Sequence, residues 1–437
     1  MKAMKHLPYN TFILIFLAVL SNIYAQDKKV QETFKWKYEV NEDVRFTFNN
    51  YNCDLIIHTT DKNEIEYHLA VDIILKSEED AEILRDYIEN LIFSHSATSA
   101  EFDNRFWKSR TNIMGKKTLE LKDGKKLRLV EFDLQGEMWI PRKTALSLTS
   151  KYSEIDVEDL SGEISLDLYN DKVYGNNLEG PLKIKVKYGK LEFKNMKDIE
   201  ADFYNTNFIA EDIGNLDLSS KYSKFRAGNA GDITIEGYND KLEFKNTGAI
   251  HWIDKYSSLL ANNVANMELD CYNSSITVTG ADDIQAKLKY GDYDFGDANL
   301  LRISSTYNTT FNLHSLAELD VTESKYSNYR IDELTLALSL QDGYSDKFII
   351  KKTANNLSGI KLAGKYINAE LVLDPGFDYL FKANVKYPKF DINEGAMDVV
   401  RKITEGSDFE MEAIKGTMKD GMPEFIVNGY DLKLVLK

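Results

Sequence analysis

Apolar and polar positions alternate at a fixed spacing along most of the chain. After each Lys-Tyr pair, apolar residues fall three, five and eight places later, as at Leu191, Phe193 and Met196. After each Tyr-Asn pair the same triplet lies one place later, as at Phe208 and Ala210. Because alternate side chains of a strand share a face, each unit predicts a short strand with an apolar inner face, followed by a turn rich in Gly, Asn and Asp.

Tyrosines mark these units at steps of 16 to 19 residues. A fixed period of this kind predicts a solenoid of stacked, similar turns. Proline is absent between Pro181 and Pro375, which fits an unbroken stack of parallel strands because proline cannot donate a ladder hydrogen bond. The marking residues are Tyr152, Tyr169, Tyr188, Tyr204, Tyr222, Tyr238, Tyr256, Tyr272, Tyr290, Tyr307, Tyr326 and Tyr344.

The length of one turn can be interpreted in two ways, as about 17 or about 35 residues. The later triplet in the Tyr-Asn units indicates one extra residue at their corner. Stacking unlike corners would then need a bulge in every second layer, whereas a turn of about 35 residues stacks like corners on like corners. We therefore predict the longer turn, and strand pairing between residues 17 apart would contradict it.

Outside the repeat the pattern changes at both ends. The stretch 26–140 predicts a strand-rich capping region with a helix near 77–92, where Ser77 opens a capping-box pattern ahead of an apolar stripe. Residues 373–437 break the repeat and predict a C-terminal cap, because an open solenoid end is an exposed strand edge. The predicted fold is thus all-β, with a parallel β-solenoid at 141–372 closed at both ends.

The first 25 residues have the features of a secretory signal peptide. Lys2 and Lys5 precede the apolar run TFILIFLAVL, and Ala25 fits a cleavage site. That run is shorter than the roughly 20 apolar residues of a spanning helix, and no later run approaches that length. We therefore expect an exported mature chain without a transmembrane segment, located in the periplasm, on the outer surface or outside the cell.

The net charge argues against one class of partner, and the cysteine content argues against a disulfide-rich fold. The formal net charge is −16, and it becomes more negative when the signal peptide is removed. Such a chain lacks the basic surface that nucleic-acid phosphates require, so we expect no nucleic-acid partner. Cys53 and Cys271 are the only cysteines, and two distant cysteines do not form a disulfide framework.

The stretch WIPRKTALSLTSKYSEIDVEDLSGEISLDL at 139–168 resembles the entry to the adhesin, or auto-transporter adhesin head, domains that are common in bacterial envelope proteins. The resemblance covers roughly residues 140–372. It implies a right-handed β-helix and a role in adhesion, and it supplies no binding residues. The Lys-Tyr-Ser and Tyr-Asn corners depart from the glycine-rich members of the family.

No motif of catalysis or cofactor binding is present. The six histidines are scattered without metal-ligand spacing, and no nucleophile, phosphate-loop or dinucleotide motif appears. Asp292, Asp294 and Asp297 lie close together but fit a solvent-facing strand better than a calcium site. We expect no catalytic residue, cofactor or metal.

A lysine precedes every second tyrosine of the repeat. With a turn of about 35 residues these lysines would form a column, each about 5 Å from the next. Acids such as Glu192 beside Lys187 and Asp292 beside Lys289 could neutralise it, or an anionic glycan along the axis could do so. The tyrosines are predicted to be structural, with a platform for sugar rings as the alternative. The lysines are Lys151, Lys187, Lys221, Lys255, Lys289 and Lys325.

The sequence favours a non-catalytic, exported, adhesin-like β-solenoid whose lateral surfaces bind a cell-envelope or extracellular ligand. The expected partner is an acidic glycan or an envelope protein. Two alternatives stay open. One is a polysaccharide-acting β-helix enzyme, because two carboxylates on neighbouring strands could serve as acid and base. The other is a periplasmic protein of envelope maintenance or sensing.

Overall fold

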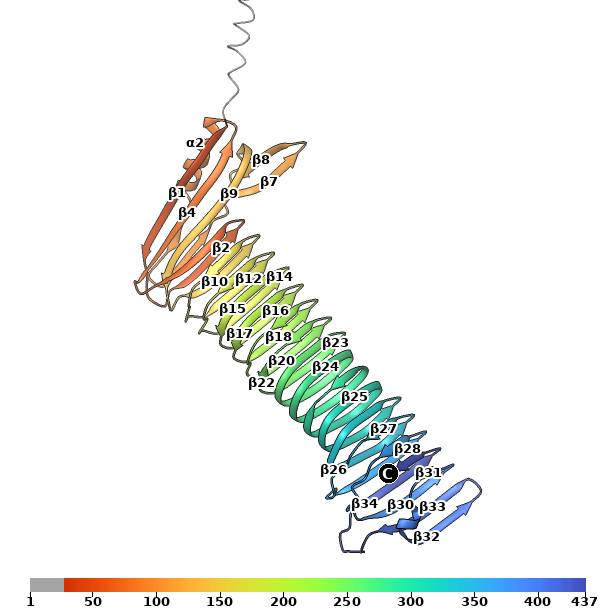
Figure 1. Cartoon of the computed structure of the whole chain (residues 1–437). Coiled ribbons are helices and arrows are strands. Elements are labelled where there is room, and N and C mark those ends of the chain that lie inside the picture. Colours follow the sequence, from red (N-terminus) through yellow and green to blue (C-terminus); the bar gives the residue numbers. More distant parts are fainter. Residues whose placement is uncertain (1–26) are drawn as a thin grey trace, which may run out of the picture. The chain divides into compact units, whose positions relative to one another are not determined.

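The computed structural model describes residues 27–437, which divide into two compact units, 27–173 and 174–437. The predicted signal peptide at 1–25 lies outside the described residues. Most of residues 27–437 lie in strands, one α-helix is present among them, and stacked parallel strands form a β-solenoid of about 13 turns (Figure 1). The predicted fold class is confirmed.

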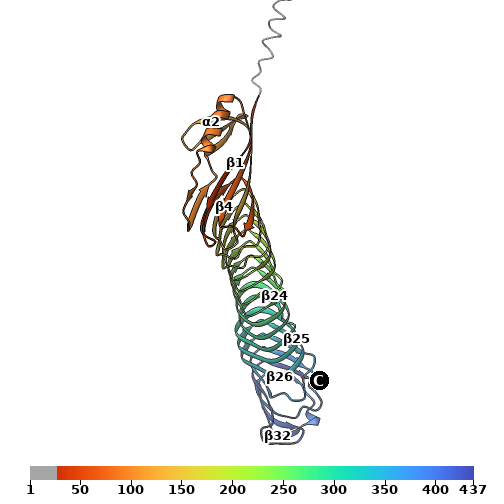
Figure 2. The ribbon, with the colours of Figure 1, turned by 90° about the vertical axis from the view of Figure 1, so that its left-hand side faces the viewer.

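The first unit begins with an antiparallel sheet in which β4 (Glu64–Leu75) pairs with both β1 (Lys28–Glu39) and β9 (Lys126–Pro141). Helix α2 (Glu78–Glu89) packs beside β1 and β4 (Figure 2), and Ser77 caps it by accepting a hydrogen bond from the Asp80 backbone N–H. Its 12 residues are too few to cross a bilayer, and no helix among residues 27–437 is long and apolar enough to do so.

Part of the solenoid also lies within the first unit. Strand β10 (Ala145–Lys151) lies between β2 (Arg45–Tyr51) and β12 (Ile164–Tyr169), parallel to both. Their partners around the corner include β3 (Asp54–Thr60) and β11 (Glu154–Val157), which pair in parallel. The remaining strands of this unit are β5 (Ser94–His95), β6 (Ser99–Asp103), β7 (Trp107–Ile113) and β8 (Lys116–Leu121).

In the first turns of the second unit each strand residue pairs with the residue 17 places later. Leu182, Ile199, Leu216, Ile233 and Ile250 occupy one register position in five successive parallel strands. The predicted turn of about 35 residues is therefore wrong, and one turn contains 17. These strands are β14 (Leu182–Lys187), β16 (Ile199–Tyr204), β18 (Leu216–Lys221), β20 (Ile233–Tyr238) and β23 (Ile250–Lys255).

A second column of strands faces the first across the apolar interior. Here Leu191 pairs with Phe208, and Phe208 pairs with Phe225. The chain passes from the first unit to the second within β13 (Lys172–Gly175). The column continues through β15 (Lys190–Met196), β17 (Asn207–Ile213), β19 (Lys224–Arg226), β21 (Lys241–Glu243) and β22 (Asn246–Thr247).

The inferred extra corner residue is also absent. Tyr204 of a Tyr-Asn unit pairs with Lys221 of the next Lys-Tyr unit. The two kinds of unit have equal length, and the tyrosine simply occupies successive positions at the corner. Because the tyrosine shifts by one register position between neighbouring turns, counting from the tyrosine gave corners of equal length unequal apparent lengths.

Later turns are wound by long strands that follow the corners without interruption. They are β24 (Ser258–Asp294), β25 (Asp297–Lys325) and β26 (Asn328–Tyr344), which follow one another along the second unit in Figure 2. The register shifts between Ala286 and Lys287 and between Leu316 and Glu318. Each shift adds a bulge residue, so turns in this part exceed 17 residues.

The C-terminal end is closed by chain reversal. Strand β34 (Glu424–Tyr430) lies between β28 (Gly359–Lys365) and β30 (Tyr379–Lys386), parallel to both. On its other side β30 pairs antiparallel with β33 (Asp408–Lys415), which continues the sheet to β32 (Asp398–Glu405). The shorter elements are β27 (Lys347–Ile350), β29 (Asn368–Leu371), β31 (Lys389–Asp391), β35 (Lys433–Leu436) and the 3₁₀ turn Glu394–Ala396.

The interior is a stack of aromatic and aliphatic side chains. Phe193, Phe225, Phe244 and Phe311, predicted to point inward, are at most 5% exposed. The rings of Phe208 and Phe225 stack with centroids 4.4 Å apart. Both cysteines are buried and unpaired, and burial raises the pKa of the Cys53 thiol to about 12.

We expect Phe244→Ala to lower the free energy of unfolding by about 3 to 5 kcal/mol, the usual cost of deleting a buried phenylalanine. Its ring is 4% exposed and lies 5.6 Å from that of Phe225. Denaturant unfolding would measure the loss, with the exposed neighbour Lys245→Ala as the control. A loss below about 1 kcal/mol at Phe244 would contradict the inward assignment.

Candidate binding edge

One corner of every turn is formed by a residue in the left-handed region of backbone space. In successive turns of the second unit, φ is +57° at Tyr222, +56° at Asn239, +67° at Tyr256 and +54° at Asn273. Asparagine tolerates this conformation, whereas a bulky residue adopts it only at a cost in energy. The eight tyrosines with positive φ in residues 27–437 therefore need a compensating interaction.

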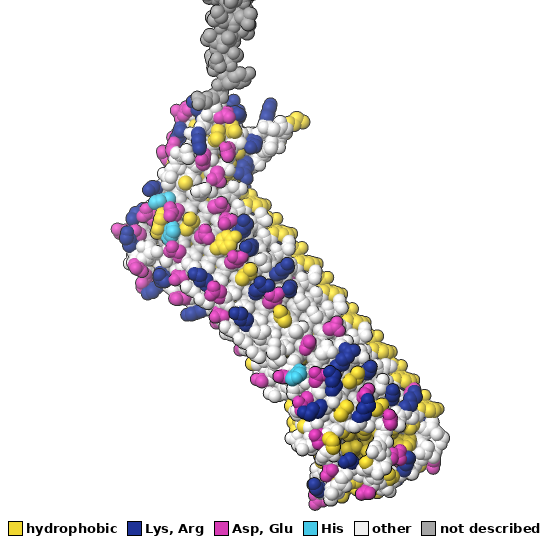
Figure 3. Space-filling view, viewed as in Figure 1, with side chains coloured by type: hydrophobic (Ala, Val, Ile, Leu, Met, Phe, Trp, Pro, Cys, Tyr) yellow, Lys and Arg dark blue, Asp and Glu magenta, His cyan; other side chains and the backbone are white. Residues whose placement is uncertain are grey.

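The compensating interaction is a continuous contact among tyrosine rings, which we call the tyrosine ladder. Neighbouring rings meet edge to face, with centroids 5.3 to 5.7 Å apart and interplanar angles of 70° to 82°. Figure 3 shows hydrophobic side chains in a row along one edge of this unit. In the second unit the ladder comprises Tyr188, Tyr204, Tyr222, Tyr238, Tyr256, Tyr272, Tyr290, Tyr307, Tyr326, Tyr344, Tyr366, Tyr430 and Tyr387.

The ladder remains partly open to solvent. Most of its rings keep between 36% and 49% of their surface exposed. Edge-to-face contact is the arrangement that the ring quadrupole favours, and each pair adds about 0.5 to 1.5 kcal/mol beyond area burial. These contacts support a structural role for the tyrosines, and the exposed rings also present aromatic surface along the edge.

The predicted lysines lie on this edge but not as a column of neighbours. Lys221 pairs in register with Tyr204 on one side and Tyr238 on the other. In the first unit Lys151 likewise lies between Tyr51 and Tyr169. Successive lysines are two strands apart, which is about 9.6 Å, so the predicted spacing of about 5 Å is wrong.

Most of these lysines have no carboxylate partner. Within residues 27–437 no carboxylate oxygen comes within 4.0 Å of the ammonium of Lys187, Lys221, Lys255 or Lys289. Lys325 differs, because Glu323 lies 2.6 Å from it. Glu192, suggested from the sequence as a neutralising partner, instead pairs with Lys190, also at 2.6 Å.

A groove of about 460 Å³ runs beside the ladder across five layers; we call it the corner groove. Tyr222 and Tyr256 alternate along it with the amides of Asn239 and Asn273. Next to them lies a column of side chains that changes along the chain from long lysines to short serines and ends at an aspartate. That column contains Lys224, Lys241, Ser258, Ser275 and Asp292, in register order.

The cationic end of the groove contains one ammonium without a carboxylate. Lys241 is 2.7 Å from Glu243, whereas Lys224 has no carboxylate within 4.0 Å among the described residues. At the opposite end Gly291 keeps the backbone close to the neighbouring layer, since a Cβ there would collide with the Ser274 carbonyl oxygen. The groove therefore combines cations, hydroxyls, amides and ring surface.

Buried polar side chains form the floor of the groove. Asp240 accepts hydrogen bonds from the backbone N–H groups of Ser223 (2.7 Å) and Tyr238 (3.1 Å) and from the Ser220 hydroxyl (3.1 Å). Burial nevertheless raises the pKa of Asp240 to about 6, because the ionised form loses hydration. Thr206 and Ser274 occupy the same position in other layers.

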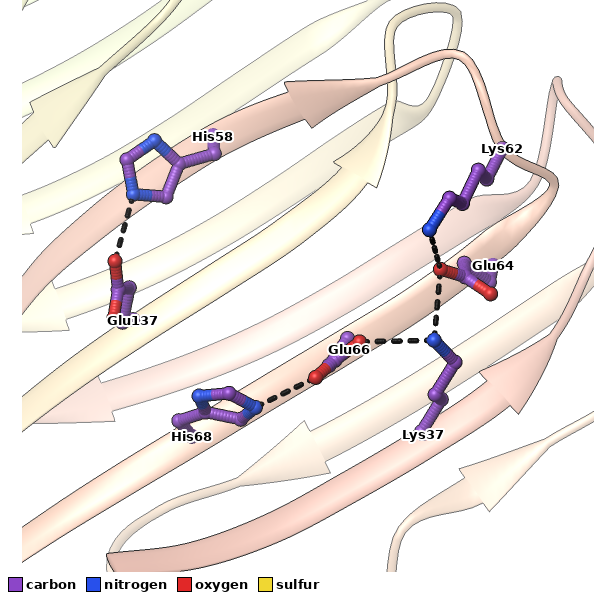
Figure 4. Close-up of polar contacts among 7 residues, drawn as sticks. All are labelled: Lys37, His58, Lys62, Glu64, Glu66, His68 and Glu137. Carbon is purple, nitrogen blue, oxygen red and sulfur yellow. Dashed lines mark hydrogen bonds and ion pairs between the residues drawn. The ribbon is translucent and has the colours of Figure 1, made fainter.

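A separate polar cluster lies on the sheet of the first unit (Figure 4). The ring nitrogens of His58 lie 3.0 Å from Glu158 and 3.0 Å from Glu137, and His68 lies 2.7 Å from Glu66. Partial burial disfavours the charged ring, but the two glutamates outweigh it and raise the pKa of His58. Among residues 27–437 no group of three or more His, Cys, Asp or Glu side chains could hold a metal ion.

Sequence reasoning missed several corners of the same type. Tyr51 and Asn52 form one, with Asn52 at φ +50° and the Tyr51 ring 5.7 Å from that of Tyr152. Tyr366 and Tyr387 form two more with positive φ. The Tyr-Asn and Lys-Tyr pairs were visible in each case, but they lie outside the regular period.

Comparisons with known proteins found only weak structural likenesses. No protein-family model and no curated protein matches the chain. A solved structure from Clostridium sporogenes, described as a "putative cell adhesion protein", is 10% identical and covers 93% of this chain and 100% of its own, with a TM-score of 0.16. Another, from Parabacteroides distasonis and described as a "putative lipid binding protein", is 12% identical and covers 68% and 94%, with a TM-score of 0.22. We draw no functional conclusion from likenesses this weak.

We expect Asp240→Thr to flatten the pH dependence of stability. The pKa of Asp240 is raised in the folded state, so the folded protein binds the proton more tightly, and this contribution to stability is lost as pH rises from about 4 to about 6. Threonine fits because Thr206 already fills the equivalent position. Melting temperatures from pH 4 to 7 would show the variant gaining on the wild type as pH rises, whereas a pH-independent difference would contradict the assignment.

Proposed function

We propose that this protein is a non-catalytic, exported, adhesin-like scaffold whose corner groove and tyrosine ladder bind an acidic polysaccharide. The observation that carries the proposal is the row of lysines without carboxylate partners, repeated every second turn beside exposed tyrosine rings. Exposed ion pairs contribute only about 0 to 1 kcal/mol each, so the absence of such pairs costs the fold little and leaves the ammonium groups available to a ligand.

The chemistry of the groove suits a sugar chain. The faces of Tyr222 and Tyr256 offer apolar surface for the C–H groups of a pyranose ring, and Asn239, Asn273 and Ser275 offer hydrogen bonds for its hydroxyls. Lysines can neutralise carboxylates or sulfates on the same chain. A polymer that contacts several equivalent turns gains avidity even when each contact is weak.

The groove supports binding better than hydrolysis. A glycosidase needs two carboxyl groups on either side of the scissile bond. Of the two aspartates at the groove, Asp240 is 5% exposed and already accepts three hydrogen bonds. Asp292 then lacks an accessible partner within the groove, so we favour a binding protein over the enzyme alternative.

We expect the triple variant Lys221→Gln, Lys224→Gln and Lys255→Gln to lose most binding to polygalacturonate or alginate at low ionic strength. Removing three ammonium groups that can pair with carboxylates of the polymer should lower affinity roughly tenfold or more, since each 1.4 kcal/mol is a factor of ten. Affinity electrophoresis or calorimetry would measure it, with neutral dextran as the ligand control. The matched control replaces Lys194, Lys197 and Lys245, which are exposed away from the groove.

Tyrosine variants separate the ring from the hydroxyl. We expect Tyr256→Phe to bind as the wild type does, because the ring face is retained, whereas Tyr256→Ala should weaken binding and also lower the melting temperature by removing two ladder contacts.

Absence of binding to every acidic polysaccharide at low salt, where screening is weakest, would refute the proposed ligand. Equal losses in the two lysine triples would indicate nonspecific charge attraction.

A further inference from the structure

The hairpin of β7 and β8 in the first unit ends in an exposed apolar tip. All residues from 110 to 117 are exposed, with Ile113 at 67% and Met114 at 100%. Figure 1 shows the hairpin extending from the sheet of its unit, and Figure 3 shows hydrophobic side chains at its end. Two adjacent apolar side chains that project into solvent in this way make the tip a candidate interaction site.

The turn at this tip has an unusual residue, Met114, at its first position. Met114 (φ +50°) and Gly115 (φ +79°) are both left-handed and connect paired strands, as in a type I′ turn. That turn strongly favours Asn, Asp or Gly at its first position. Met114 adopts a costly conformation there without packing against anything, so its side chain contributes nothing evident to the fold.

The charge of the hairpin is opposite to that of the chain. Residues 107–117 carry Lys108, Arg110, Lys116 and Lys117 and no acid, in a protein with a formal net charge of −16. Within the described residues Lys116 has no carboxylate within 4.0 Å, and the Lys117 ammonium donates to the Val130 carbonyl oxygen, which leaves its charge in place. Arg110 donates a hydrogen bond to the Asn52 side chain, and of these four residues only Lys108 has a carboxylate partner in the described part of the chain, Glu120 at 3.2 Å.

We propose that the β7–β8 hairpin docks on a membrane surface containing anionic phospholipid. Ile113 and Met114 enter the boundary between headgroups and acyl chains, and Lys116 and Lys117 contact the phosphates. Apolar insertion and basic residues act together at such surfaces, and neither is sufficient alone. The two-residue turn fixes Met114 at the outermost point, so insertion requires no unfolding of the hairpin. This inference does not depend on the polysaccharide proposal.

The test is flotation of the chain from Gln26 onward with lipid vesicles, so that the apolar run of the signal peptide does not itself bind lipid. We expect binding to vesicles of phosphatidylglycerol mixed with phosphatidylcholine, weak binding to phosphatidylcholine alone, and loss of binding as salt rises. Met114→Asn should reduce binding roughly tenfold, the factor expected from losing one buried apolar side chain. The same change installs the favoured turn residue, so the melting temperature should stay equal or rise.

Two control variants make the result specific. Met418→Asn removes another exposed methionine, 61% exposed, and should leave vesicle binding unchanged. The triple variant at Lys221, Lys224 and Lys255 should also bind vesicles normally, whereas Lys116→Gln with Lys117→Gln should not. No binding of the wild type to anionic vesicles at low salt overturns the proposal, as does wild-type binding that Met114→Asn leaves intact; either result would direct attention to a protein partner for the tip.

Discussion

Every turn of the solenoid depends on one left-handed residue that lets the chain change direction within a single position. Glycine would adopt this conformation without strain, yet the chain places tyrosine or asparagine there in nearly every layer. The cost is offset locally, by ring contacts on the outside and by hydrogen-bonded side chains such as Asp240 on the inside. The conformation of the corner is therefore held by contacts on both of its sides, although the corner lies at the surface.

The alternation of Lys-Tyr and Tyr-Asn units follows from the geometry of ring contacts. Identical positions in neighbouring strands are about 4.8 Å apart, and rings at one position in every layer would stack in parallel, as those of Phe208 and Phe225 do in the interior. Placing the ring at successive positions in alternate layers, as in Tyr222 and Tyr238, yields edge-to-face contact at 5.5 Å. Lysine then fills the position that the ring has left, with its aliphatic stem between two tyrosines and its ammonium in solvent.

The alternation of Lys-Tyr and Tyr-Asn units also explains which features of the fold could be predicted from the sequence and which could not. Strand pattern and inward residues such as Phe225 were predictable, because the period of two is local. The turn length was not, because a marker that shifts by one place doubles the apparent period. Tyr51 was missed because the capping region separates it by about 100 residues from its register partner Lys151. The insertion of β34 between earlier strands is a long-range pairing that no local pattern encodes, and the groove depends on side-chain bulk compared across five layers.

In a solenoid of similar turns, a distinct surface feature such as the corner groove forms where side chains at one register position differ from layer to layer. Along the column that borders the corner groove, Lys224 and Lys241 are long, whereas Ser258 and Ser275 are short, and the groove opens where bulk falls. None of these residues supports the corner, because the left-handed residue and its buried neighbour do that. Substitutions in the column can therefore reshape the surface at little cost in stability, and the same separation applies at the β7–β8 tip, where Met114 is free to depart from the preferred turn residue because no other part of the fold packs on it.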